Sequence, residues 1–195
     1  MRNGRIGGGL VLGGWALLSA GMALSWVAGS AVGGATMSAA LAVVGSGAAV
    51  IAIKGPAPLG GRLVRFWLGI LAVGLFGIAG SAIAAARLTY DPLEDWPTIV
   101  LLLGGGLAAL IGMLFTQLSL LVARGLARKL GALFFAGFAG IYLAQGLAAI
   151  SQDVAPLRIV AGLLAIVAVA VFLVGCAGPG VLAFRGDLAH AVAPE

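Results

Sequence analysis

The chain has 195 residues, of which 62% are hydrophobic and only 9% are charged, and its formal net charge is +5. Soluble domains average about 25% charged residues, and a soluble fold could not hide this much apolar surface from water. The composition therefore excludes a cytosolic globular enzyme, a disulfide-rich secreted domain, a disordered tail and a nucleic-acid-binding domain. It predicts a polytopic membrane protein.

Six apolar segments follow one another, and each is close to the roughly 20 residues that a helix needs to cross the hydrocarbon core. Acidic residues, lysine and histidine are absent from all six, and none alternates as the strands of a membrane barrel do. We therefore predict an all-α fold of six transmembrane helices. They run approximately over residues 6–27, 31–53, 66–86, 98–123, 130–150 and 157–184.

The first segment follows Arg2 and Arg5, so it could be a signal peptide or a first membrane helix. Its apolar run is longer than the 7–15 residues usual in signal peptides. A second apolar run begins directly after Gly29 and Ser30. We expect a retained first membrane helix.

Basic residues collect in alternate connections between the segments. Because cytoplasmic loops are enriched in Lys and Arg, this side is expected in the cytoplasm together with both termini. The positive charge then reports topology, and no nucleic-acid partner is expected. An arginine-, alanine- and glycine-rich composition with little lysine suggests a high-GC bacterium and hence its inner membrane. Nine of the eleven basic residues share the expected cytoplasmic side: Arg2, Arg5, Lys54, Arg62, Arg65, Arg124, Arg128, Lys129 and Arg185.

The opposite side carries most of the acids. Asp91-Pro92-Leu93-Glu94 has the spacing of a capping box with proline at the first helical position, which predicts a short interfacial helix. Asp91, Glu94 and Asp95 either mark the translocated, solvated side or bind a cation or a basic partner. We expect the first.

A spacing of 62 residues relates the starts of the first, third and fifth segments, at Gly7, Gly69 and Gly131. Each of these segments enters from the side expected in the cytoplasm, so we predict three tandem helical hairpins. Together they form a single domain over residues 1–195. The hairpins cover approximately 1–61, 62–125 and 126–185, with a polar tail at 186–195.

A family resemblance can be seen in the second hairpin. Phe66-Trp67-Leu68-Gly69-Ile70-Leu71, Gly77, Asp91-Pro92, Leu103-Gly104-Gly105 and Gly112 give it a pattern that resembles the HdeD-type bacterial membrane proteins, which are built from short repeats. The first hairpin lacks the outer-loop proline of this pattern. The resemblance implies a link to acid resistance, as in enteric bacteria, but no catalytic residues.

Glycine accounts for 33 residues, against a usual share of about 7%. In bilayers, small residues four positions apart let helix backbones approach closely. Such positions either pack the bundle internally or form a platform for lipid, for the helices of another membrane subunit or for a second copy. The predicted packing positions are Gly9, Gly13, Gly34, Ser38, Gly77, Ser81, Gly104, Ala108 and Gly112.

Few residues at membrane depth could carry chemistry. Gln117, Tyr142 and Gln145 either form polar contacts between helices, which we favour, or line a path for a neutral solute. The run from Cys176 to Gly180, with Pro179 inside it, predicts a kink or an end of the sixth helix. The single cysteine is expected to be a buried apolar residue.

No catalytic, metal-binding or cofactor-binding constellation can be assembled from these residues. His190 is the only histidine, which excludes bis-histidine haem ligation and histidine-based zinc sites, and charged groups that mark proton relays are missing from the segment interiors. We expect a non-enzymatic accessory or structural subunit without a cofactor. It would contact the lipid bilayer and either another membrane subunit or its own copies. The alternative is a channel or facilitator for a small neutral solute or lipid.

Overall fold

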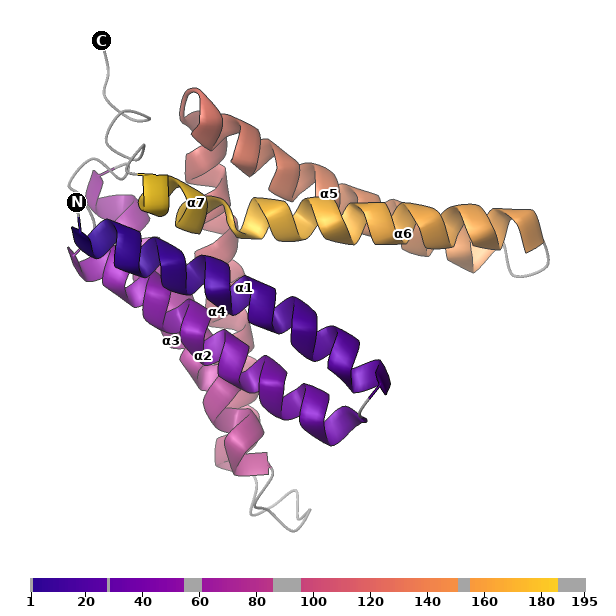
Figure 1. Ribbon diagram of the computed structural model, residues 1–195, viewed down its shortest axis with the longest axis horizontal. Helices are drawn as coiled ribbons and strands as arrows, with labels where there is room; N and C mark the ends of the chain where they lie inside the picture. Colours follow the sequence, from indigo (N-terminus) through magenta and orange to yellow (C-terminus); the bar gives the residue numbers. More distant parts are fainter. Residues whose placement is uncertain (1, 28, 55–60, 86–95, 151–154, 186–195) are drawn as a thin grey trace. The chain divides into compact units, whose positions relative to one another are not determined.

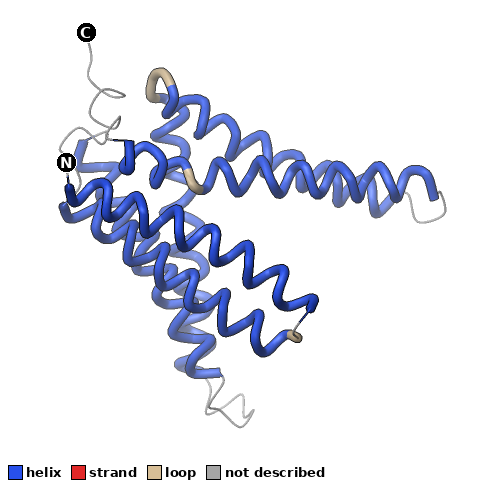
Figure 2. Tube along the Cα trace, viewed as in Figure 1, coloured by secondary structure: helices blue, strands red, loops and turns tan. Residues whose placement is uncertain are grey.

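The computed structural model describes residues 2–27, 29–54, 61–85, 96–150 and 155–185. This part of the chain is helical except for short turns and contains no strand (Figures 1 and 2). Six of its helices are long and apolar enough to cross a membrane, which confirms the predicted all-α polytopic membrane fold. The described helices are α1 (Arg2–Val27), α2 (Ser30–Lys54), α3 (Gly61–Ala85), α4 (Trp96–Val122), α5 (Leu126–Ile150), α6 (Ala155–Cys176) and α7 (Gly178–Arg185).

Three helices, α1, α3 and α5, begin four or five residues before the predicted apolar segments, at their basic ends. The α1 helix begins at Arg2 and α5 at Leu126, so α5 includes Arg128 and Lys129 in its first turns. Long basic side chains can reach the polar interface from the end of a membrane helix, so apolar composition alone underestimates helix length.

The predicted break in the last segment is confirmed. The α6 helix ends at Cys176, α7 begins at Gly178, and Ala177 forms the turn between them. The Ala177 nitrogen still donates to the Leu173 carbonyl, at 3.0 Å. Pro179 cannot continue this series because it has no N–H.

The described helices fall into two compact units. The first comprises residues 1–116 and 179–195, and the second comprises residues 117–178. The first unit thus holds α1, α2, α3 and most of α4, with α7 from Pro179 onward. The second holds the end of α4 with α5 and α6. The single domain and its three repeated hairpins stay predictions.

Within the first unit, α1 and α2 touch through their backbones. A Cβ added to Gly14 would lie 2.5 Å from Val44 Cγ2 and 2.8 Å from the Val44 nitrogen, and one on Gly47 would lie 2.8 Å from the Gly7 carbonyl oxygen. The start of α1 therefore meets the end of α2, so the pair is antiparallel. Most contact positions alternate at three and four residues, as in coiled coils. They are Gly7, Val11, Gly14 and Gly21 on α1 and Gly33, Met37, Ala40, Val44, Gly47 and Ile51 on α2.

The α3 and α4 helices of this unit approach in the same way. A Cβ on Gly112 would lie 2.5 Å from the Leu71 nitrogen and 2.8 Å from the Trp67 carbonyl oxygen. The Trp67 ring stacks on Phe115 with 4.3 Å between centroids. A Cβ on Gly105 would lie 3.0 Å from the Gly74 carbonyl oxygen, so the close contact extends over several helical turns.

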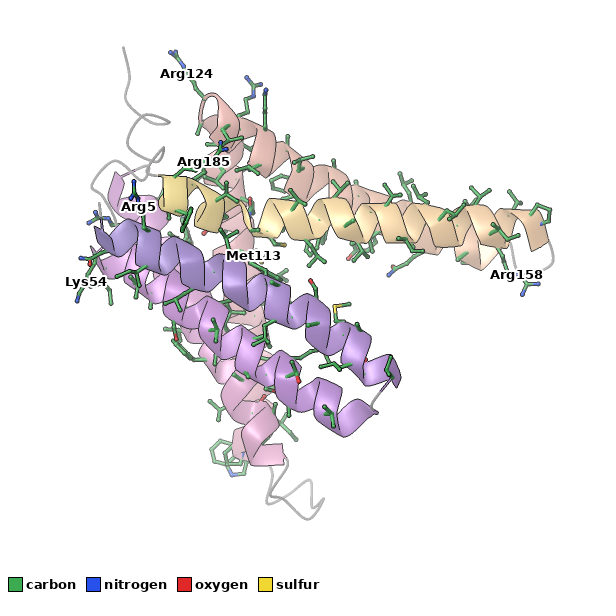
Figure 3. All side chains as sticks on the ribbon, viewed as in Figure 1. Arg5, Lys54, Met113, Arg124, Arg158 and Arg185 are labelled. Carbon is green, nitrogen blue, oxygen red and sulfur yellow. The ribbon has the colours of Figure 1, made fainter. Side chains whose placement is uncertain are left out.

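Residues 179–185 of α7 pack on the start of α1. A Cβ on Gly8 would lie 2.5 Å from the Gly180 carbonyl oxygen and from the Phe184 nitrogen. Arg5, Lys54 and Arg185 consequently lie at one end of the first unit (Figure 3). This clustering is what the charge distribution along the sequence predicts for one membrane side.

The second unit is built on the α5–α6 pair. Gly137 lies against the backbone of Phe172, and a Cβ on Gly140 would lie 2.8 Å from Ala168 Cβ. Phe134 is buried, and its ring centroid lies 5.0 Å from that of Phe172. Arg124 and Arg158 lie at opposite ends of this unit (Figure 3).

Some predicted features fall on residues outside the described ranges. These are the capping box at 91–94, the acidic outer loop around it and the polar tail at 186–195. Asp153 and His190 also lie outside the described part of the chain.

The contact between α1 and α2 gives a matched test on adjacent residues. Gly14→Ala is expected to destabilise the protein by about 1–3 kcal/mol or more, because its Cβ would collide with the Val44 backbone. Gly13→Ala should leave stability unchanged or slightly raised, since nothing lies within 4 Å of that Cβ. Unfolding in mild detergent, followed by circular dichroism, measures both. Equal stability of the two variants would contradict the described contact.

The charge distribution predicts that both termini face the cytoplasm. Alkaline phosphatase fused after Glu195 should be inactive and green fluorescent protein at the same position should fluoresce, because phosphatase needs the oxidising side and the basic connections are retained in the cytoplasm. Phosphatase fused after Asp91 should be active. High phosphatase activity after Glu195 would contradict this topology.

Candidate functional site

Gln117 is the buried polar side chain around which the second unit closes. It lies on α4 and is only 1% exposed. Its Nε2 donates a hydrogen bond of 3.1 Å to the carbonyl oxygen of Gly175 on α6. Close by, a Cβ on Gly131 of α5 would lie 3.0 Å from the backbone carbonyl oxygen of Gln117. One residue therefore links the end of α4 to both other helices of the unit.

The Gly175 carbonyl, which accepts the hydrogen bond from Gln117, lacks the usual backbone donor of an α-helix. In an α-helix the Gly175 carbonyl would accept from the N–H four residues later, but that position is Pro179. Proline has no N–H to donate. An unpaired backbone carbonyl at membrane depth costs several kcal/mol in principle, so the Gln117 amide supplies the hydrogen bond that the sequence of the break removes.

The other half of the Gln117 amide is unsatisfied. Its Oε1 is buried and has no hydrogen-bond partner among the described residues. Leaving a buried acceptor unpaired costs about 1–3 kcal/mol. Gln117 is therefore a neutral polar point with a free acceptor inside an otherwise apolar unit.

Tyr142 and Gln145 do not join Gln117. Both are exposed on α5, and Tyr142 lines a surface hollow of about 650 Å³ together with Leu143 and Gly146. Its ring packs edge-on against Phe138, 4.9 Å between centroids. The two residues follow Gly131, which lies beside Gln117, by 11 and 14 positions, or about 16 and 21 Å along the helix. The three predicted polar residues therefore do not line one path within the second unit.

The predicted small-residue positions divide into packed and open ones. Gly77 and Gly112 lie against a neighbouring helix, and a Cβ on Gly77 would be 3.0 Å from the Gly105 Cα. Ser81 is buried, and Ala108 borders a groove where α2, α3 and α4 come together. No atom lies within 4 Å of the Cβ that would be added at four others: Gly9, Gly13, Gly34 and Gly104.

Many of the glycines that do pack were missed by reasoning from spacings of four. On α1 they are Gly8, which packs on α7, and Gly7 and Gly14, which pack on α2 and continue at a spacing of seven residues to Gly21. On α4, Gly105 packs while its neighbours Gly104 and Gly106 are open. The seven-residue spacing on α1 is a signal that the sequence contains, because that period keeps one helix face against an antiparallel partner.

The described hydroxyl groups mostly satisfy themselves within their own helices. Ser38 donates to the Gly34 carbonyl at 2.9 Å, and Thr116 donates to the Gly112 carbonyl at 2.7 Å. Such bonds to the preceding turn hide a hydroxyl from the lipid without a second helix. These groups therefore do not mark a polar pathway.

Groups that could hold a metal ion are not assembled in the described ranges. No three His, Cys, Asp or Glu side chains come together there. Cys176 is buried, at 3% exposure.

Comparison of the chain with family models, curated proteins and solved structures finds no match. The resemblance to HdeD-type proteins accordingly stays a prediction. The six long apolar helices make the chain a multi-pass membrane protein.

The hydrogen bond to Gly175 can be tested by a double-mutant cycle. Gln117→Met keeps the length of the side chain but loses its donor, so the cycle should give a coupling energy between positions 117 and 179 of about 0.6–1.7 kcal/mol. In a Pro179→Ala background the same change should cost less, because position 179 then brings its own N–H to the Gly175 carbonyl. Gln145→Met, at an exposed site, should have no effect. Equal costs in both backgrounds, measured by unfolding in detergent, would show that Gln117 does not cover this carbonyl.

Proposed function

We propose that this multi-pass membrane protein is a non-catalytic accessory or structural subunit that binds another membrane helix. The observation that supports it is the open glycine stripe formed by Gly9 and Gly13 on α1. A Cβ at either position meets no atom within 4 Å, whereas Gly7 and Gly14 of the same helix lie against α2. The α1 helix therefore packs Gly7 and Gly14 on α2 and Gly8 on α7, and leaves Gly9 and Gly13 open.

Helix geometry separates the open glycines from those that pack on α2. At 3.6 residues per turn, Gly9 and Gly13 lie about 40° apart, and each is about 100–160° from Gly7 and Gly14. The α2 helix repeats the arrangement, because Gly33 packs on Ser25 while Gly34 is open. The first hairpin thus presents small residues outward from both of its helices.

An outward glycine stripe suits a helical partner better than lipid alone. Lipid tails are as apolar as leucine, so helices associate in bilayers by close packing, and small residues permit that packing. A partner with its own small residues, or a second copy of this chain, could approach α1 at backbone distance. We propose no cofactor and no enzymatic activity for such a subunit.

The proposed setting is a bacterial inner membrane with both termini in the cytoplasm. The clustering of Arg5, Lys54 and Arg185 at one end of the first unit supports this orientation. A stress-related role, as in HdeD-type proteins, rests on the resemblance of the second hairpin alone. The alternative of a channel or facilitator for a neutral solute or lipid has less support, because Tyr142 and Gln145 lie far from Gln117.

Association through the stripe predicts a defined complex in mild detergent. Native mass spectrometry should find the protein as an oligomer or with a stoichiometric partner. Gly9→Leu with Gly13→Leu should abolish the complex without lowering the stability of the chain, since the Cβ added at either position meets no atom within 4 Å. Gly162→Leu, at an equally open position on α6, should leave the complex intact. A monomeric wild-type protein under several gentle conditions would overturn the proposal.

A further inference from the structure

A groove of about 590 Å³ crosses the first unit where α2, α3 and α4 come together. Its lining includes Ile53 from α2, Ala108 from α4, and Arg65, Phe66, Gly69 and Val73 from α3. The size is within the 300–1,000 Å³ usual for small-ligand sites.

The walls of the groove are apolar and face outward. Ile53, Phe66 and Val73 are 74%, 58% and 69% exposed. Gly69 lies between Phe66 and Val73 on α3, and a Cβ at this position would meet nothing within 4 Å. The groove therefore has an empty floor at Gly69 and exposed apolar sides, which an aliphatic chain would fill.

One end of the groove is positively charged. Among the described residues that line the groove, Arg65 is the charged one, and it lies in the second turn of α3. Lys54 ends α2 directly after Ile53. Arginine is the side chain best suited to phosphate because its planar guanidinium can donate two parallel hydrogen bonds. An occupant that complements this groove has an anionic head at Arg65 and an apolar tail beyond it.

The length of the groove matches one membrane leaflet. Eight residues separate Arg65 from Val73, which corresponds to about 12 Å along the helix. Half of a hydrocarbon core of about 30 Å is about 15 Å. An acyl chain whose headgroup lies at the level of Arg65 would therefore run along the groove and end near the middle of the bilayer.

We propose that this groove binds one anionic phospholipid, with its phosphate at the Arg65 guanidinium and one acyl chain between Phe66 and Val73 over Gly69. The site is independent of the glycine stripe on α1, so it stands whether or not the chain is an accessory subunit. The groove selects anionic phospholipid over the bulk lipid of the bilayer because Arg65 and the apolar walls contact the same lipid molecule.

Lipid titration of the purified protein tests this site. In native mass spectrometry, one phosphatidylglycerol per chain should bind about fivefold or more tightly than phosphatidylcholine with the same acyl chains, as expected for one basic residue near an anionic lipid. Arg65→Gln should abolish that preference and Arg65→Lys should retain part of it. Gly69→Leu, which fills the floor, should lower binding of the first lipid molecule.

Matched controls separate the site from general effects. Arg128→Gln removes an exposed arginine elsewhere, and Gly80→Leu adds the same side chain at another open position of α3; neither should change binding. Thermal unfolding checks each variant, and Val73→Asn replaces Gly69→Leu where the latter is unstable. Equal affinity for both lipids, or unchanged binding in Arg65→Gln, would overturn the proposal. Displacement of the lipid by inorganic phosphate alone would also overturn it. A change of oligomeric state in Gly69→Leu would overturn it as well and would assign the groove to a second copy.

Discussion

Close approach of helix backbones at glycine is the interaction on which this structure depends. In a bilayer the tails around a helix are as apolar as its side chains, so helices gain little by hiding apolar surface from lipid. They are held instead by packing at short distance. Gly14 against Val44, Gly112 against Leu71 and Gly137 against Phe172 each permit a distance that any Cβ would prevent. The high glycine content follows from this requirement.

Adjacent glycines on one helix serve different purposes. Gly13 and Gly14 are neighbours in the chain, but about 100° of rotation separates them, so one faces open space while the other packs on α2. Gly104 and Gly105 divide in the same way on α4. A substitution at an open glycine can therefore leave the packed glycine beside it unchanged. Gly69 adds a third purpose, since the missing side chain creates the floor of a groove.

Polar groups within the spans form hydrogen bonds with backbone carbonyls of the helices. Hydroxyls such as those of Ser38 and Thr116 bond back to their own helix and need no partner. Gln117 differs because its donor crosses to the Gly175 carbonyl, where Pro179 removes the ordinary helical donor. A break that would be costly in lipid is in this way compensated by a single amide, and the end of α4 is tied to the end of α6.

The sequence alone determined the six spans, the alternation of charge between connections and the break near Pro179. These depend on the length of an apolar run, on where charges can reside and on the missing N–H of proline, all of which are local properties. Only the tertiary structure decided which glycines pack. Small residues occupy several faces of each helix, so a spacing of four at Gly9 and Gly13 was as plausible as a spacing of seven at Gly7 and Gly14. The shape of the partner, such as Val44 on α2, selects between them. The partner of Gln117 is likewise 58 residues away, beyond what any local pattern could indicate.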